Sequence, residues 1–272
     1  MRLLISTTFI GMILITLIVG GCDWFSPESK KAKHLELGQT YFDKGQYREA
    51  LIEFENVAQL DPKNADTHYR LALTYLKLGG RTNLQGAFAE LSQTVELDKT
   101  NRDAQLKLGE LYLLGNEPAK AREQADIVLV SAPTNTEGLI LKGRSLINEK
   151  HYAEGIAELK KAIELDPKNM GTYIDLARAQ VFAKDTAAAE ETLKKALTID
   201  PRSTEILVAL GDFFATTGKP DQAEISYKQA LEIAPENGDI YLKLTNFYQR
   251  YSKWAEVETT LQKLAEIGRA HV

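Results

Sequence analysis

The sequence predicts an all-α protein of about seven helix-turn-helix repeats that follow a short N-terminal export segment. Three observations lead to this fold class. Prolines recur at a fixed interval, small residues recur at two positions within that interval, and large apolar residues recur at positions between them. Self-similarity at a period of roughly 34 residues is typical of repeat proteins, in which each unit buries its apolar face against its neighbours.

The export segment comes first in the chain. A charged start at Arg2 leads into an apolar stretch that ends at Val19, as in a secretory signal. Residues 19–22 read Val-Gly-Gly-Cys and resemble the lipobox of bacterial lipoproteins. That resemblance implies that residues 1–21 are removed and that Cys22, the only cysteine in the chain, is lipidated. An uncleaved transmembrane anchor is the alternative, because the stretch is only slightly short for a membrane span.

Either form of anchor places the rest of the chain outside the cytoplasm. We expect residues 22–30 to be a short tether and residues 31–272 to form the repeat domain. The expected location is the bacterial cell envelope, with the lipidated N-terminus in the bilayer and the repeats facing the periplasm. Asp23 directly follows the cysteine and resembles an inner-membrane retention signal, which slightly favours the inner membrane over the outer membrane.

The prolines set the frame of the repeats. Pro133, Pro167, Pro201 and Pro235 are each 34 residues apart, whereas Pro62 precedes Pro133 by 71 residues, which is one repeat of 34 and one of 37. One repeat therefore carries a three-residue insertion. If each proline takes the thirty-second position, the repeats begin at Lys31, Ala65, Arg102, Thr136, Met170, Thr204 and Gly238.

Small and large residues recur within this frame. Small residues are predicted where two helices approach closely, since a large side chain there would force them apart. The eighth position holds Gly38, Ala72, Gly109, Gly143, Ala177, Gly211 and Thr245, and the twentieth holds Ala50, Ala87, Ala121, Gly155, Ala189, Ala223 and Val257. Large side chains predicted to fill the core at the twenty-fourth position include Phe54, Leu91, Leu159, Leu193, Tyr227 and Leu261.

This pattern resembles the tetratricopeptide repeat (TPR) family from Lys31 to about Ile267. The resemblance implies a right-handed α-solenoid whose concave face binds other proteins. Lys142 departs from the pattern because it stands where leucine is usual. The last repeat departs most: no capping helix follows it, so Val257, Leu261, Leu264 and Ile267 are expected to leave apolar surface uncovered.

Nothing in the sequence predicts catalysis. No phosphate-binding loop, metalloprotease motif or nucleophile elbow is present, so we expect no catalytic residue, metal, cofactor or small-molecule substrate. The net charge of -5 includes no basic block, which argues against nucleic acid as a partner. His34 and His68 share the fourth position of adjacent repeats. They make a metal pair conceivable, but partly exposed helix residues are the better interpretation.

The resemblance also implies which residues line the concave face. In the family, the second, fifth, ninth, twelfth and thirteenth positions of each first helix point inward. Arg144 and Arg178 fall at the ninth position of adjacent repeats and are the predicted specificity residues for an acidic partner group, although Glu110 and Asp212 flank them and could neutralise them. The predicted partner-binding residues are Leu35, Gln39, Tyr69, Leu73, Leu106, Glu110, Ile140, Arg144, Ile174, Arg178, Phe182, Val208 and Asp212.

The predicted function is a membrane-anchored scaffold that holds a protein partner in this groove. The opening of the repeat domain resembles TPR lipoproteins of exosortase and exopolysaccharide systems, which implies a role in assembly or export of an exopolysaccharide or a surface protein. A lipoprotein similar to the pilotins of type IV pili and a TPR regulator of a cell-wall enzyme remain the alternatives.

Overall fold

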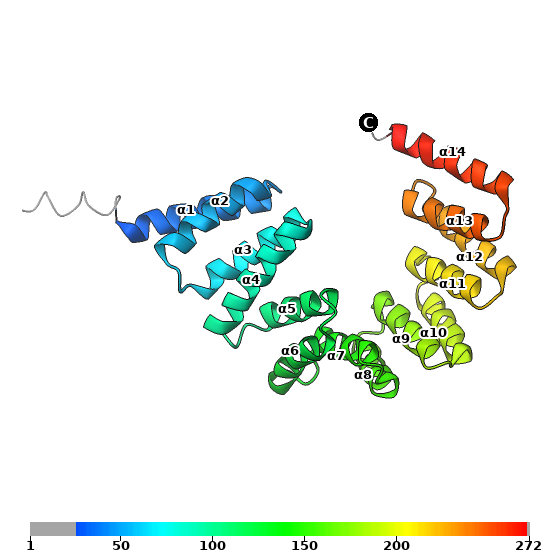
Figure 1. Cartoon of the computed structure of the whole chain (residues 1–272), viewed down its shortest axis with the longest axis horizontal. Helices are drawn as coiled ribbons and strands as arrows, with labels where there is room; N and C mark the ends of the chain where they lie inside the picture. The colour runs from blue at the N-terminus through cyan, green and yellow to red at the C-terminus, as the bar shows by residue number, and fades with distance from the viewer. Residues whose placement is uncertain (1–25, 271–272) are drawn as a thin grey trace, which may run out of the picture. The chain divides into compact units, whose positions relative to one another are not determined.

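The computed structural model describes residues 26–270, which fold entirely into helices and turns (Figure 1). The all-α fold is therefore confirmed for this part of the chain. Its fourteen helices, in order, are α1 (Pro27–Asp43), α2 (Tyr47–Leu60), α3 (Ala65–Leu78), α4 (Arg81–Leu97), α5 (Arg102–Leu114), α6 (Pro118–Ser131), α7 (Thr136–Asn148), α8 (Tyr152–Leu165), α9 (Met170–Phe182), α10 (Thr186–Ile199), α11 (Thr204–Thr216), α12 (Pro220–Ile233), α13 (Gly238–Arg250) and α14 (Trp254–Ala270).

The helices follow the predicted repeat frame. Helices α3, α5, α7, α9, α11 and α13 each begin at the first residue of a predicted repeat. The first repeat differs, because α1 begins at Pro27 and the last residues of the predicted tether are helical. The Ser26 side chain explains this start, since its hydroxyl oxygen accepts a hydrogen bond from the Ser29 N–H at 3.1 Å and Pro27 suits the first helical position.

Side-chain caps explain why the first helices begin where they do. The last residue of a repeat is asparagine or serine, and its side-chain oxygen accepts a hydrogen bond from a backbone N–H of the following helix. Asn169, for example, accepts from Thr172 at 3.2 Å. The capping residues are Asn64, Asn101, Asn135, Asn169, Ser203 and Asn237.

The turn between the two helices of a repeat has a fixed geometry. The fifteenth residue has a positive φ angle in every repeat, which favours glycine, but glycine occupies only three of the seven positions. The residues at this position are Gly45, Gly79, Asn116, Lys150, Lys184, Gly218 and Ser252. The sequence analysis predicted a turn at the glycines, and the structure shows that the other residues adopt the same conformation.

The predicted close approaches between helices are confirmed. A Cβ atom at Gly38 would lie 2.6 Å from the ring of Phe54, and one at Gly211 would lie 2.5 Å from the ring of Tyr227. Both rings are buried, so glycine leaves the space that they occupy. All residues at the predicted twentieth position are buried, including Val257 at 7% exposure, where uncovered apolar surface was expected. Leu261 is 45% exposed, because no further helix covers α14 in the described residues. Its predicted place in the core is therefore wrong, whereas the uncovered apolar surface expected at this residue is confirmed.

Two departures from the repeat pattern have local explanations. The three-residue insertion lengthens the second helix of its repeat, since α4 has 17 residues where most second helices have 14. Lys142, which replaces the usual leucine on α7, reaches across to α6, where its Nζ lies 2.7 Å from Oδ1 of Asp126. An ion pair between helices thus takes the place of an apolar contact.

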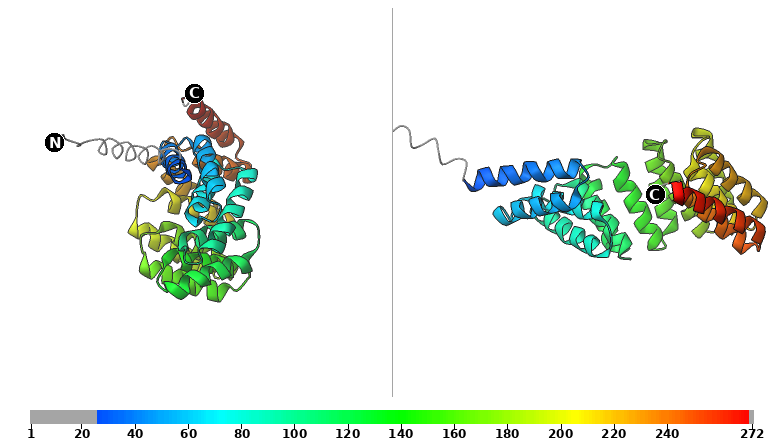
Figure 2. Two further views of the ribbon diagram at one scale, coloured as in Figure 1. Left: turned by 90° about the vertical axis from the view of Figure 1, so that its left-hand side faces the viewer. Right: turned by 90° about the horizontal axis from the view of Figure 1, so that it is seen from above.

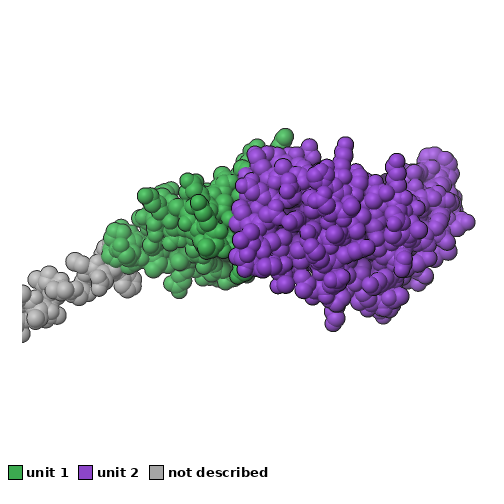
Figure 3. Space-filling view, turned by 90° about the horizontal axis from the view of Figure 1, so that it is seen from below, with its two compact units in different colours: residues 1–111 green, residues 112–272 purple. Residues whose placement is uncertain are grey.

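The chain forms two compact units (Figure 3). The boundary between them lies within α5. The first ends at Leu111 and the second begins at Tyr112. Within each unit, helices that follow one another in sequence pack together, for instance α1 with α2 and α11 with α12 (Figure 2). An extended core cluster lies in the second unit and runs from Leu139 on α7 to Val257 on α14.

Candidate protein-binding surface

In the described part of the chain, three hollows between first helices are lined by seven of the thirteen predicted binding residues. One is in the first unit and two are in the second. Each takes residues from the fifth and ninth positions, with the twelfth or thirteenth, of adjacent repeats. The structure thus brings together side chains about 34 residues apart in sequence, as the repeat frame predicted.

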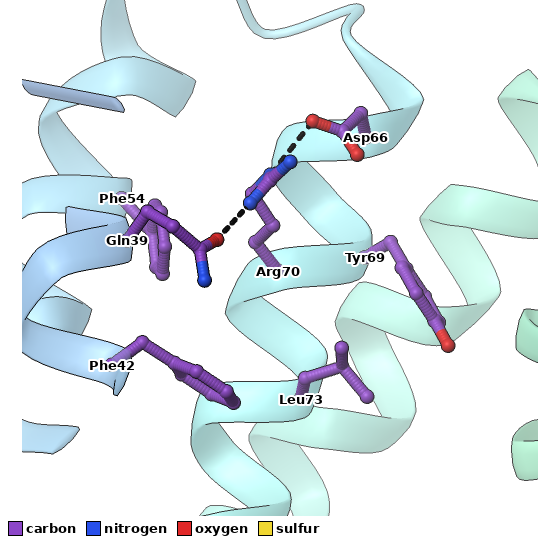
Figure 4. A pocket seen from close by; sticks show the side chains of 7 residues that line it. All are labelled: Gln39, Phe42, Phe54, Asp66, Tyr69, Arg70 and Leu73. Atoms are coloured by element: carbon purple, nitrogen blue, oxygen red, sulfur yellow. Dashed lines mark hydrogen bonds and ion pairs between the residues drawn. The ribbon is translucent and has the colours of Figure 1, made fainter. Parts of the chain in front are cut away.

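The hollow of the first unit has a volume of about 190 Å³ and is mixed in character. Gln39 and Phe42 come from α1, and Tyr69 and Leu73 come from α3. Figure 4 shows the side chain of Arg70 extending from α3 towards Gln39 on α1. The apolar side chains of Phe42 and Leu73 lie below it in this view.

Arg70 fixes the polar side of this hollow. Its Nε donates to Oδ2 of Asp66 at 2.8 Å, and its Nη1 donates to the side-chain oxygen of Gln39 (Figure 4). The sequence analysis missed Arg70, which lies at the sixth position of its repeat. Because two acceptors already hold the guanidinium, this hollow offers mainly its apolar wall to a partner.

The two hollows of the second unit lie on either side of α9. One, of about 450 Å³, is lined by residues of α5, α7 and α9 that include Leu113, Arg144 and Asn148. The other, of about 250 Å³, is lined by residues of α9, α10 and α11. Ile174 and Arg178 line both hollows, so α9 is the shared wall.

Asp175 organises the charges of this region and was missed by the sequence analysis. Its Oδ2 accepts a hydrogen bond from Nε of Arg144 at 2.6 Å, and its Oδ1 lies 3.7 Å from Nη1 of Arg178. The Asp175 side chain is only 10% exposed, whereas that of Arg178 is 62% exposed. Asp175 lies at the sixth position, which the family's inward positions did not include, so only the repeat stacking reveals it.

Asp212, which the sequence left open as a neutralising residue, has both carboxylate oxygens held by other groups. Tyr227 donates its hydroxyl to Oδ1 of Asp212 at 2.6 Å, and Nζ of Lys243 lies 2.5 Å from Oδ2. Burial and the hydrogen bond to this carboxylate raise the pKa of Tyr227 above its ordinary value, so the phenol remains a donor. Glu110 is exposed and lies in the other unit.

The remaining predicted residues divide between surface and core. Leu106 is 5% exposed and Ile140 is 9% exposed, so both are core residues and their predicted place on the binding face is wrong. Leu35 and Val208 are half-buried against core clusters. Phe182 is 52% exposed, and its ring stacks on Tyr152 at a centroid distance of 6.1 Å. Leu35, Leu106, Ile140 and Val208 differ in burial because neighbouring repeats cover the fifth position to different extents, whereas Phe182 lies at the thirteenth position.

The two histidines do not form a pair. Nδ1 of His34 lies 2.5 Å from Oε2 of Glu53, and Nδ1 of His68 lies 2.6 Å from Oε2 of Glu90. Each histidine thus joins the first helix of its repeat to the second. The metal pair considered from sequence is replaced by two imidazole–carboxylate contacts.

The predicted lipidation site, Cys22, lies outside the described residues. Within residues 26–270, no helix combines the length and the apolar character needed to cross a bilayer.

Comparison with known families decides the fold. A model described as "TPR repeat" matches residues 38–79, and three models described as "Tetratricopeptide repeat" match residues 103–135, 146–195 and 174–238. These matches fall on the helix pairs described above. The chain has the tetratricopeptide repeat fold. None of the four matching models describes a catalytic family, and TPR proteins in general are scaffolds.

Solved structures with the TPR fold resemble this chain over most of its length. A tetratricopeptide repeat protein from Parabacteroides merdae is 16% identical with a TM-score of 0.74, and the similarity covers 88% of this chain and 94% of that one. PilW, titled a widely conserved type IV pilus biogenesis factor, is 20% identical with a TM-score of 0.65 and coverage of 79% and 98%. At these identities the likeness shows the fold alone.

A curated relative matches a shorter region. DnaJ homolog subfamily C member 3 from Rattus norvegicus is 33% identical over 105 residues. These residues are 39% of this chain and 20% of the relative, so the chain matches only about a fifth of that protein's length.

Proposed function

We propose that this TPR chain is a lipid-anchored scaffold of the bacterial cell envelope that binds a protein partner through the hollows between its first helices. One observation carries the binding role. In each hollow, adjacent repeats present partly exposed apolar side chains beside charged ones, such as Ile174 beside Arg178. Mixed concave surfaces of this kind suit a helix or an extended segment of another protein. The anchoring part of the proposal rests on the lipobox at residues 19–22.

The proposed task is to hold a component during assembly or export of an exopolysaccharide or a surface protein. The resemblance of the first repeat to TPR lipoproteins of such systems supports this task. Assembly of type IV pili is the second candidate, supported by the similarity to PilW over 98% of that chain's length. Both candidates place the partner in the envelope, and they differ in its identity.

In vivo photo-crosslinking in the native bacterium tests the binding role. A photoreactive phenylalanine analogue replaces Ile174 in the wall shared by the two hollows, or Lys195 on the exposed side of α10 as the control. We expect a protein crosslink from position 174 and none from position 195, and mass spectrometry of the adduct identifies the system. Crosslinks from position 195 alone would contradict the proposed surface.

The same cells test the anchor. Cys22→Ser should abolish labelling by a fatty-acid analogue and move the protein from the membrane to a precursor or soluble fraction. Labelling that persists in the Cys22→Ser variant contradicts the lipoprotein assignment.

A further inference from the structure

A side-chain contact joins consecutive repeats at three of the six junctions between the predicted repeats. The side chain at the ninth position of one repeat binds the side chain at the sixth position of the next, 31 residues later. Gln39 binds Arg70 in this way, Arg144 binds Asp175, and Asp212 binds Lys243. The ninth side chain is thus used within the protein in each of these three cases.

At the other three junctions one member of the pair has an apolar side chain, so the contact cannot form for Leu73, Glu110 or Arg178. The arginine among these three is Arg178. It occupies the ninth position, but the residue 31 positions later is Ala209, whose side chain has no polar atom. Its ion pair in the described part of the chain is the 3.7 Å contact with Asp175 on its own helix. That distance is long for a hydrogen bond. The Arg178 side chain is 62% exposed, so the guanidinium donors remain accessible.

The local charge count leaves Arg178 uncompensated. Arg144 and Arg178 share the single carboxylate of Asp175, and Arg144 holds it at 2.6 Å. Asp212, across the smaller hollow, is already paired with the ammonium of Lys243. One positive charge is therefore left over where the two hollows meet, and a complementary partner must carry a negative charge there.

Apolar groups surround this charge. Ile174 lies one helical turn before Arg178 on α9, and Phe182 lies one turn after it. Val181 and Phe213 line the hollow towards α11. A guanidinium flanked by apolar surface favours a carboxylate, which it can bind with two hydrogen bonds while the neighbouring contacts exclude water.

We propose that Arg178 is the specificity-determining residue of this surface and that it binds an aspartate or glutamate carboxylate flanked by apolar residues in a segment of the partner protein. This inference rests on the proposed function and specifies the chemistry of its partner. Arg144 is a positioning residue, since it holds Asp175 and so limits the pairing of that carboxylate with Arg178.

A peptide selection tests the proposal. Random 12-residue peptides displayed on phage are selected on the full-length protein in detergent, and the enriched peptides are synthesised with each acidic residue or its amide. We expect an acidic residue next to apolar residues, and a loss of about tenfold or more in affinity for the amide form. Arg178→Ala should cause a similar loss, and combining it with the amide peptide should add little, because both changes remove one interaction.

Ala209→Asp tests the role of Arg178 without removing the arginine. It supplies the sixth-position carboxylate that Arg178 lacks, as Asp175 does for Arg144. We expect this variant to keep the helical circular dichroism and thermal stability of the wild type but to bind acidic peptides as weakly as Arg178→Ala. Arg202→Ala, in an exposed turn of the same unit, is the matched control and should bind as the wild type does.

The outcomes separate this inference from the proposed function. Peptides that bind Arg178→Ala and Ala209→Asp as tightly as the wild type, but lose affinity for Ile174→Asp, overturn the carboxylate assignment and leave the binding surface in place. Peptides that bind all three variants equally overturn both.

Discussion

At the scale of single residues, the fold depends on a few positions where only glycine fits. Gly211 on α11 faces the ring of Tyr227 on α12, and that ring is 2% exposed with its hydroxyl bound to Asp212. The ring therefore cannot move aside at low cost. The eighth position of the repeat is constrained by a close approach of helices and not by its backbone conformation.

We predict that Gly211→Ala destabilises the protein by about 1–3 kcal/mol, because the new methyl group would lie 2.5 Å from Tyr227. Chemical denaturation followed by circular dichroism measures the change. Gly268→Ala on α14 is the control, since a Cβ there meets no atom within 4 Å and alanine favours a helix. Equal stability of Gly211→Ala and the wild type would show that the assigned packing is wrong.

The arginines that line the hollows have two different roles. Arg70 and Arg144 bind acceptors inside the protein and shape the hollows, whereas Arg178 keeps an accessible guanidinium. The residue type alone does not separate these roles. The difference lies in the residue that a neighbouring repeat places opposite each arginine, which is Gln39 of the preceding repeat for Arg70 and Asp175 of the following repeat for Arg144.

At the scale of helices, carboxylates join consecutive repeats. Glu224 on α12 accepts hydrogen bonds from Tyr248 of α13 at 3.1 Å and from Lys253 in the following turn at 2.5 Å, and Lys228 lies 2.7 Å away on its own helix. Burial opposes ionisation of Glu224, but the hydrogen bonds from Lys228, Lys253 and Tyr248 outweigh it and lower its pKa from 4.5 to about 2.

This lowered pKa predicts a pH dependence of stability. The Glu224 carboxylate stabilises the folded state fully above pH 4.5, and its contribution is lost as the pH falls towards about 2. We expect Glu224→Gln to lower the free energy of unfolding by roughly 1–3 kcal/mol at neutral pH, with a smaller difference from wild type near pH 2.5. Urea denaturation between pH 2.5 and 7 measures both values.

The control for this pH series is Glu232→Gln, because Glu232 is exposed on the same helix. It should follow the wild-type profile within about 0.5 kcal/mol. A Glu224→Gln profile parallel to that of the wild type at every pH would contradict the role assigned to the carboxylate.

At the scale of the whole molecule, contacts are local because each helix packs mainly on the helices next to it in sequence. Stability in such proteins is approximately a sum over repeats and their neighbours. A local defect should therefore loosen its own repeats first and leave distant repeats protected.

We predict that Gly38→Ala, which would place a methyl group 2.6 Å from Phe54, accelerates amide hydrogen exchange in α1–α3 and leaves α11–α13 unchanged. Gly211→Ala should give the reverse pattern. Hydrogen-exchange mass spectrometry of both variants measures the two regions together. Equal acceleration in both regions for either variant would mean that the chain opens as one cooperative unit.

The sequence by itself determined the repeat frame, and through it most of the fold. The starts of the first helices follow from the capping residues and from the prolines that end five of the seven repeats, and these signals act over a few residues. The positions where helices approach closely could also be predicted, because small residues recur at fixed positions of the repeat and large residues recur at the positions that pack against them. For the same reason the frame predicted that Gln39 and Leu73, or Ile174 and Arg178, line common hollows.

Only the tertiary structure decided which of those residues are accessible and how their charges are used. The burial of Leu106 and Ile140 depends on how closely the next repeat covers each fifth position. The pairing of Arg144 with Asp175, and the absence of such a partner at Ala209, depend on the offset between stacked helices, which places residues 31 positions apart in contact. That offset arises from side-chain packing between repeats, whereas the periodicity of the sequence reports only the spacing along the chain.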